Sequence, residues 1–217
     1  MQKVKILAIV IAAILVSGCY TLSINQLYNK DDVVFEKSLL GIWGNPENSE
    51  ETWIFKKSDD NAYRLVVKDK GVTQSIQIKK EGEAGTFKKT GDGSFMLNIS
   101  EDPVKDGIFE VHLMKLDDQL FMDVYPEKPK SINDMYSSHI IQAHSIFKLI
   151  LDGDKLCLAS LNNDWLKKNL KAEKTNIEHV NRDGMIILAA STEELQKFVV
   201  KYVDKAFEEL DEAYRLD

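Results

Sequence analysis

The histidines are the side chains best suited to catalysis or metal binding near neutral pH. The chain has four of them: His112, His139, His144 and His179. His139 and His144 are five residues apart, so on a shared strand they would point to opposite faces and could not bind one metal from there. His112 lies in an alternating segment, and His179 lies in an irregular polar stretch. The histidines therefore predict neither a metal centre nor a catalytic cluster.

Short catalytic motifs give the same answer. The sequence contains no H-E-x-x-H, C-x-x-C, G-x-S-x-G or phosphate-binding glycine loop. Asp152-Gly153-Asp154 lacks the further oxygen ligands of a calcium loop and separates two apolar segments, so it predicts a hairpin turn. We expect no catalytic residue, no metal and no cofactor, and we predict that the protein is not an enzyme. A triad assembled from distant residues stays open at this point.

One long connection stands apart from the others. Residues 126–138 separate two alternating segments by thirteen residues, where a hairpin needs only about two to five. Such a loop is either a tolerated insertion or a lid over the open end of a barrel. In a lid, Met135 and Tyr136 are the apolar residues placed to touch a ligand or partner, with His139 and His144 near the rim. These four residues are the candidate ligand-binding set.

The first of the two cysteines follows a short cationic start and an apolar run over residues 6–16. That run is too short to cross a bilayer, whose ~30 Å hydrocarbon core needs about 20 helical residues, but it suits the central region of an export signal. Val16-Ser17-Gly18-Cys19 resembles the lipobox of bacterial lipoproteins, which has an aliphatic residue, two small residues and then the cysteine. An ordinary buried helix and a cleaved signal without lipid are the alternatives.

The resemblance to lipoproteins implies a cellular location. Residues 1–18 would be removed as a signal peptide, and Cys19 would carry the acyl chains that anchor the protein in membrane lipid. Tyr20 stands where an aspartate would mark retention in the inner membrane, so the resemblance implies the bacterial cell envelope with the outer membrane favoured. Residues 19–37 lack a clear period and predict a lipidated tether, with a first packed segment near residues 33–35.

Composition limits the partners of the mature chain. Without residues 1–18 the chain has 199 residues, with 26 basic and 35 acidic side chains and a net charge near −9. Nucleic acid is therefore an improbable partner. Cys157 has no second cysteine to pair with once Cys19 is acylated, so no disulfide supports the fold. Its apolar neighbours predict that Cys157 is a small buried side chain rather than a reactive thiol.

Short alternating segments separated by turn residues fill the middle of the chain and predict strands. The expected strands are 52–55, 63–68, 73–80, 86–89, 95–100, 108–115, 119–125, 140–151 and 155–160. Their close spacing without intervening helices predicts a mainly β protein with an antiparallel up-and-down meander. Closure into a barrel or a curled sheet would protect its edges. One face of the meander would be buried, and the other would carry exposed residues such as His112 and Asp123. Residues 102–106 predict a solvated loop.

Two helices are expected late in the chain. Asn162 and its polar neighbours can cap a short helix over residues 165–170. After a strand at 185–188, Ser191 and Glu194 form a capping box. Apolar residues then follow helical spacing as far as Leu210, which predicts an amphipathic C-terminal helix packed on the outside of the sheet.

Gly41-Ile42-Trp43 comes just before the first alternating strands. This G-x-W, the meander after it and the late helix together resemble the lipocalin-like barrel proteins. The resemblance implies one domain over residues 38–217, in which Gly41 lets the chain pass closely under the barrel and Trp43 closes its bottom. The basic residue that often covers this tryptophan cannot be assigned from the sequence. The chain also holds more expected strands than the eight of a simple lipocalin.

Three functions follow from this fold. The first is a binding module for a small hydrophobic ligand, held inside the barrel. The second is a structural or interaction lipoprotein of the envelope, whose barrel is filled by its own side chains and whose partner is an envelope protein. The third is a hydrolase or isomerase with a dispersed site, which no motif supports. Large inward residues would favour the second function over the first: Phe109, Leu113, Met122, Phe147 and Leu149.

Overall fold

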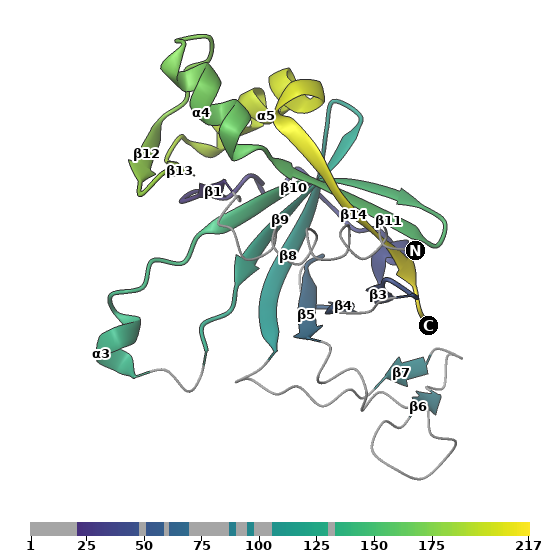
Figure 1. Ribbon diagram of the computed structural model, residues 1–217. Helices are drawn as coiled ribbons and strands as arrows, with labels where there is room; N and C mark the ends of the chain where they lie inside the picture. The colour runs from purple at the N-terminus through teal and green to yellow at the C-terminus, as the bar shows by residue number, and fades with distance from the viewer. Residues whose placement is uncertain are drawn as a thin grey trace, which may run out of the picture.

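Eight strands close into an antiparallel β-barrel in the computed structural model, which describes residues 21–47, 51–58, 61–69, 87–89, 95–97, 106–129 and 133–217 (Figure 1). Each strand pairs with the next along the chain, and the last pairs with both the seventh and the first. The barrel strands are β3 (Gly41–Gly44), β4 (Glu51–Lys57), β5 (Tyr63–Asp69), β8 (Gly107–Leu116), β9 (Gln119–Pro126), β10 (His144–Asp152), β11 (Lys155–Leu161) and β14 (Phe207–Arg215). The predicted up-and-down barrel is confirmed.

Local turn chemistry sets the hairpins of this barrel. Asp117 and Asp118 join β8 to β9 with φ angles of 45° and 61°, and Gly153 joins β10 to β11 with a φ of 58°. Aspartate and glycine tolerate these left-handed conformations better than most residues do. The predicted strand at 73–80 lies outside the described residues. A separate hairpin is formed by β6 (Phe87–Lys89) and β7 (Phe95–Leu97).

The interior of the barrel holds one hydrophobic cluster. Side chains at alternate positions of the strands point inward, as period-two spacing requires. The buried members are Leu39, Trp43, Phe55, Tyr63, Leu65, Val111, Leu113, Met122, Val124, Phe147, Leu149, Leu156 and Leu158. Cys157 lies between two of them and therefore points outward, where it is half-buried rather than fully buried as the sequence predicted. Partial burial still raises the pKa of its thiol.

The stretch of chain between β11 and β14 forms a second layer, which covers part of the outside of the barrel. It contains α4 (Asn163–Lys171), β12 (His179–Arg182), β13 (Met185–Leu188) and α5 (Thr192–Ala206). The outward residues Met114, Phe121 and Ile146 join its hydrophobic cluster. The Asn162 cap of α4 and the capping box of α5 are both present, as predicted. Part of the outer face of β8 and β9, which was expected to be exposed, is therefore covered, although Glu110 stays exposed.

The C-terminal helix ends earlier than its spacing predicted. The helix α5 ends at Ala206, and Phe207 and Leu210 belong to β14, which closes the barrel by pairing with β11 and β3. Leu210 packs against the interior cluster from this strand. Pairing on both edges of β14 outweighs the helical propensity of its acidic and alanine residues. None of the helices within the described ranges is long and apolar enough to cross a bilayer.

The predicted tether is wrong for residues 21–32, which pack on the barrel. The strand β1 (Leu22–Ser23) pairs antiparallel with β10 and parallel with β13, and Leu27 is fully buried. Cross-strand hydrogen bonds and apolar burial order a segment whose own pattern is too short to show a period. The packed segment expected near residue 33 is present as β2 (Val33–Val34), which pairs with β8 and is followed by the 3₁₀ helix η1 (Lys37–Leu39). The globular fold thus includes residue 21 rather than starting at 38.

Candidate functional site

Trp43 and Gly41 lie together at one end of the barrel. The Trp43 side chain is fully buried, and its indole Nε1 donates a hydrogen bond of 2.8 Å to the Leu39 carbonyl oxygen. The guanidinium carbon of Arg215 lies 4.5 Å from the centre of the indole ring, within the range of a cation–π contact. Arg215 is therefore the basic residue over the tryptophan that could not be assigned from sequence.

Gly41 gives Arg215 the space it occupies. The backbone φ of Gly41 is 133°, a value that residues with a side chain rarely adopt. A Cβ atom here would lie 2.4 Å from Nη1 of Arg215 and 2.8 Å from Oδ1 of Asp217. Arg215 also donates a hydrogen bond of 2.9 Å to the Leu40 carbonyl oxygen. The glycine, the tryptophan and the C-terminal residues therefore form one closed end of the barrel.

The barrel interior is filled by bulky side chains. Among the five residues chosen to test this point, Leu113, Met122, Phe147 and Leu149 are buried in the interior cluster, and Phe109 packs against it half-buried. Trp43, Phe55 and Tyr63 occupy the same interior. An eight-stranded barrel is just wide enough for side chains or for one small ligand. In this barrel the interior is occupied by the protein's own side chains.

The candidate ligand-binding residues fall into two places. Met135, Tyr136 and His139 gather around the short helix α3 (Asp134–Ser137), where with Asn133 they line a shallow hollow of about 300 Å³. Nδ1 of His139 donates a hydrogen bond of 2.7 Å to the Met135 carbonyl oxygen. His144 is not part of this hollow. It is the first residue of β10. The strand was predicted to begin at residue 140, but residues 140–143 are not part of it.

His144 instead bonds to a buried carboxylate on the outer face of the barrel. Its Nδ1 lies 2.6 Å from Oδ1 of Asp123, whose side chain is only 1% exposed. The other carboxylate oxygen, Oδ2, accepts a hydrogen bond of 2.7 Å from the backbone N–H of Leu27. The Tyr125 ring packs against the imidazole with ring centres 4.5 Å apart. Asp123 therefore joins β9, β10 and the N-terminal segment.

A second histidine completes this outer cluster, which consists of Tyr28, Glu110, His112, Asp123 and His144. The His112 ring stacks on the Tyr28 ring with centres 4.0 Å apart, and its Nε2 lies 3.6 Å from Oε1 of Glu110. Burial lowers the pKa of His112, while the Glu110 and Asp123 carboxylates oppose that shift. Burial, and then the same two carboxylates, raise the pKa of Tyr28 to about 12.

The outer cluster contains side chains of the kinds that occur in catalytic sites. A carboxylate-oriented histidine can act as a general base. The side-chain partner of His144 among the described residues is Asp123, and no serine, threonine or cysteine side chain of the same residues hydrogen-bonds to His112 or His144. Nor do the described residues bring three or more His, Cys, Asp or Glu side chains together as metal ligands. What the outer cluster does in this geometry is hold residues 21–32 against the barrel.

The depressed pKa of His112 predicts a loss of stability in mild acid. Because the folded-state pKa lies below the 6.5 of an ordinary histidine, the unfolded chain is protonated first as the pH falls. The contribution of neutral His112 is thus complete above pH 6.5 and decreases below it. His112→Phe keeps a ring on Tyr28 and cannot titrate. Urea unfolding between about pH 5 and 8 should show the free energy of the parent falling relative to this variant; parallel curves would contradict the prediction.

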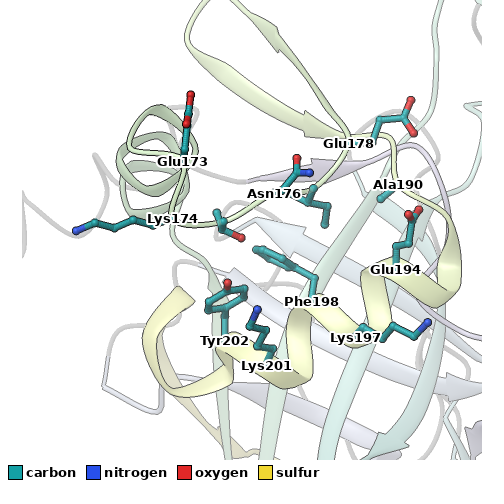
Figure 2. A pocket seen from close by; sticks show the side chains of 12 residues that line it. Glu173, Lys174, Asn176, Glu178, Ala190, Glu194, Lys197, Phe198, Lys201 and Tyr202 are labelled. Atoms are coloured by element: carbon teal, nitrogen blue, oxygen red, sulfur yellow. The ribbon is translucent and has the colours of Figure 1, made fainter.

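A larger groove lies outside the barrel, beside α5. It has a volume of about 730 Å³, with Ile177, Ala190 and Phe198 as its buried apolar lining. Figure 2 shows Phe198, Lys201 and Tyr202 projecting from α5 toward the segment that carries Asn176. Charged side chains of both signs surround the lining: Glu173, Lys174, Glu178, Glu194, Lys197 and Lys201. The sequence did not predict this groove, because residues 173–178 and the helix α5, which line it, are brought together only by tertiary packing.

Comparison with protein-family models, with curated proteins and with solved structures found no match. The class of protein is therefore defined by the fold alone: an eight-stranded antiparallel β-barrel with a helical layer on one side.

Proposed function

We propose that this chain is a lipid-anchored, non-enzymatic interaction protein of the bacterial cell envelope, in which the barrel is a scaffold for outer surfaces. The filled barrel interior carries the proposal. Anchoring is supported by the sequence pattern at residues 16–19, and Cys19 lies outside the described residues. Tyr20 favours the outer membrane, as the resemblance to lipoproteins implies.

Packing energetics disfavour a ligand inside this barrel. A hydrophobic guest would have to displace side chains such as Phe55, Met122 and Phe147, which are buried against one another. Each large apolar side chain moved into water costs roughly 1.5–3 kcal/mol. A small ligand gains too little contact area to offset several such displacements. We therefore propose that the partner of the filled barrel is a surface, either of an envelope protein or of the membrane.

A binding module for a small hydrophobic ligand is the second candidate, with the groove beside α5 as its site. The groove volume of about 730 Å³ falls within the usual range for small-molecule sites, and Phe198 and Ile177 supply an apolar lining. The surrounding charges would suit an amphipathic molecule better than a fully apolar one. This candidate keeps the ligand-binding function and moves it from the barrel interior to the outside.

Native mass spectrometry of the full-length protein, extracted in a mild detergent, separates these candidates. The interaction protein is expected at the mass of the acylated chain with no further small molecule. A ligand that consistently co-purifies would favour the binding module. In that case Tyr202→Ala, in the groove, should reduce its occupancy, whereas Tyr136→Ala, on the exposed α3 loop, should leave the occupancy unchanged.

Metabolic labelling tests the anchor separately. Cells that express the full chain should incorporate labelled palmitate into it, and Cys19→Ser should abolish both the label and the recovery of the protein with membranes. Ser17→Thr keeps a small residue near the cleavage point and serves as the control. Membrane recovery of an unlabelled protein would overturn the proposed lipid anchor.

A further inference from the structure

Exposed apolar side chains gather on one side of the molecule. Among the described residues, six of the nine large apolar side chains that are exposed belong to this side. Three of them are mostly in solvent: Ile141 is 81% exposed, Met135 75% and Tyr136 64%. We call the set the apolar side: Ile24, Met135, Tyr136, Ile140, Ile141 and Val180. Solvent-exposed side chains of this kind, when grouped, mark an interaction surface rather than random exposure.

The fold explains why residues so distant in sequence share a side. Ile24 directly follows β1, which pairs with the start of β10 and with β13, and Val180 lies in β12, which pairs with β13. Residues 140–143 lead from α3 into the same start of β10. Figure 1 shows β12, β1 and α3 along one side of the molecule. The apolar side is therefore made of residues at the end of β1, in β12, in α3 and between α3 and β10.

The position of β1 also restricts where an acyl anchor can be. Cys19 comes three residues before Leu22, so its Cα lies within about 10 Å of β1 even when that stretch is fully extended. The tight packing of residues 21–32 removes the long tether that would let the globule float free. In a chain acylated at Cys19, β1 and the adjacent Ile24 would therefore lie close to the bilayer surface.

We propose that the apolar side rests on the bilayer and inserts the α3 loop into the lipid interface, so that the protein has one fixed orientation on the membrane. This inference depends on the proposed acylation of Cys19. Residues 135–143 contain no carboxylate, and their titratable side chains are Tyr136 and His139, so insertion of these residues, which follow Asp134, would bury no negative charge. Tyr136 suits this depth, because tyrosine is enriched where an apolar ring meets the polar headgroups.

Tyr136→Trp in the full-length, acylated protein tests the orientation. The protein is reconstituted into vesicles of phosphatidylethanolamine and phosphatidylglycerol, with or without brominated acyl chains that quench nearby indoles. The introduced indole should lose about half of its emission in the brominated vesicles, as expected for a side chain at the lipid interface. Because Tyr136 is mostly exposed, its replacement should not disturb folding. The parent protein supplies the background emission of its own tryptophans.

Ile150→Trp is the matched control. Ile150 is 44% exposed and lies on β10, but near the hairpin at the far end of that strand from α3. Its indole should keep its emission. Equal quenching at both positions, or none at position 136, would overturn the fixed orientation and leave the apolar side to an envelope protein. Mass spectrometry before reconstitution separates the two proposals: a chain without acyl groups contradicts the anchor, whereas an acylated chain without quenching contradicts only this inference.

Discussion

Trp43→Ala is expected to lower the free energy of unfolding by about 3–5 kcal/mol, the usual cost of deleting a large buried aromatic side chain. The loss should fall at the upper end of that range for two reasons. The Leu39 carbonyl oxygen loses its indole donor, and the Arg215 guanidinium loses the ring on which it lies. Since domains of this size are stable by only about 5–15 kcal/mol, the variant should be close to unfolding at growth temperature.

Urea denaturation followed by circular dichroism measures this effect. Trp53→Ala is the matched control: Trp53 lies opposite Trp43 in the β3–β4 pair but is only half-buried, so its loss should cost clearly less. Trp43→Phe keeps a ring under Arg215 and should recover part of the stability. If Trp43→Ala costs no more than Trp53→Ala, then Trp43 does not close the barrel in the way that its geometry indicates.

Local signals were enough to predict most of the barrel. Period-two spacing placed the residues around Val111 on the inward face, and the aspartate and glycine turns fixed the hairpins. The caps at Asn162 and Ser191 were equally readable, because a cap depends on residues within one helical turn of itself. The G-x-W at Gly41 was expected just before the first strand, whereas Gly41–Gly44 is itself the first barrel strand, which the sequence did not predict.

Long-range pairing accounts for what the sequence did not predict. Phe207–Arg215 has helical propensity, and only the free edges of β3 and β11 make it a strand. Asp106 ends a segment that reads as a solvated loop, yet its buried carboxylate lies 2.7 Å from the buried ammonium of Lys68. A sequence gives no sign of which charged residues find such partners, because the partner lies far away along the chain.

The same limit applies to the candidate site. Met135, Tyr136 and His139 were grouped correctly because they are sequence neighbours on one loop. His144 was placed with them and instead bonds to Asp123, because the strand begins at His144 and points its side chain to the outer face. Alternation assigned Asp123 to the exposed face of β9. It could not reveal that residues 21–32 cover that face.

Asp123→Ala is expected to release the N-terminal segment and to cost about 3–5 kcal/mol of stability. The substitution leaves the buried N–H of Leu27 without an acceptor and removes the partner of His144 Nδ1. An unpaired buried donor alone costs about 1–3 kcal/mol, and a hydrogen bond to a charged group contributes about as much again. Since Asp123 joins three parts of the chain, the damage should be greatest where those parts meet.

Hydrogen exchange measured by mass spectrometry can locate that damage. The amides of residues 21–32 should exchange much faster in Asp123→Ala than in the parent, whereas those of β4 and β5 should change little at low denaturant. Asp123→Asn keeps an oxygen that can accept from Leu27 and should retain most of the protection. Uniform acceleration across the barrel, or unchanged exchange over residues 21–32, would mean that Asp123 supports the barrel itself and does not hold the N-terminal segment in place.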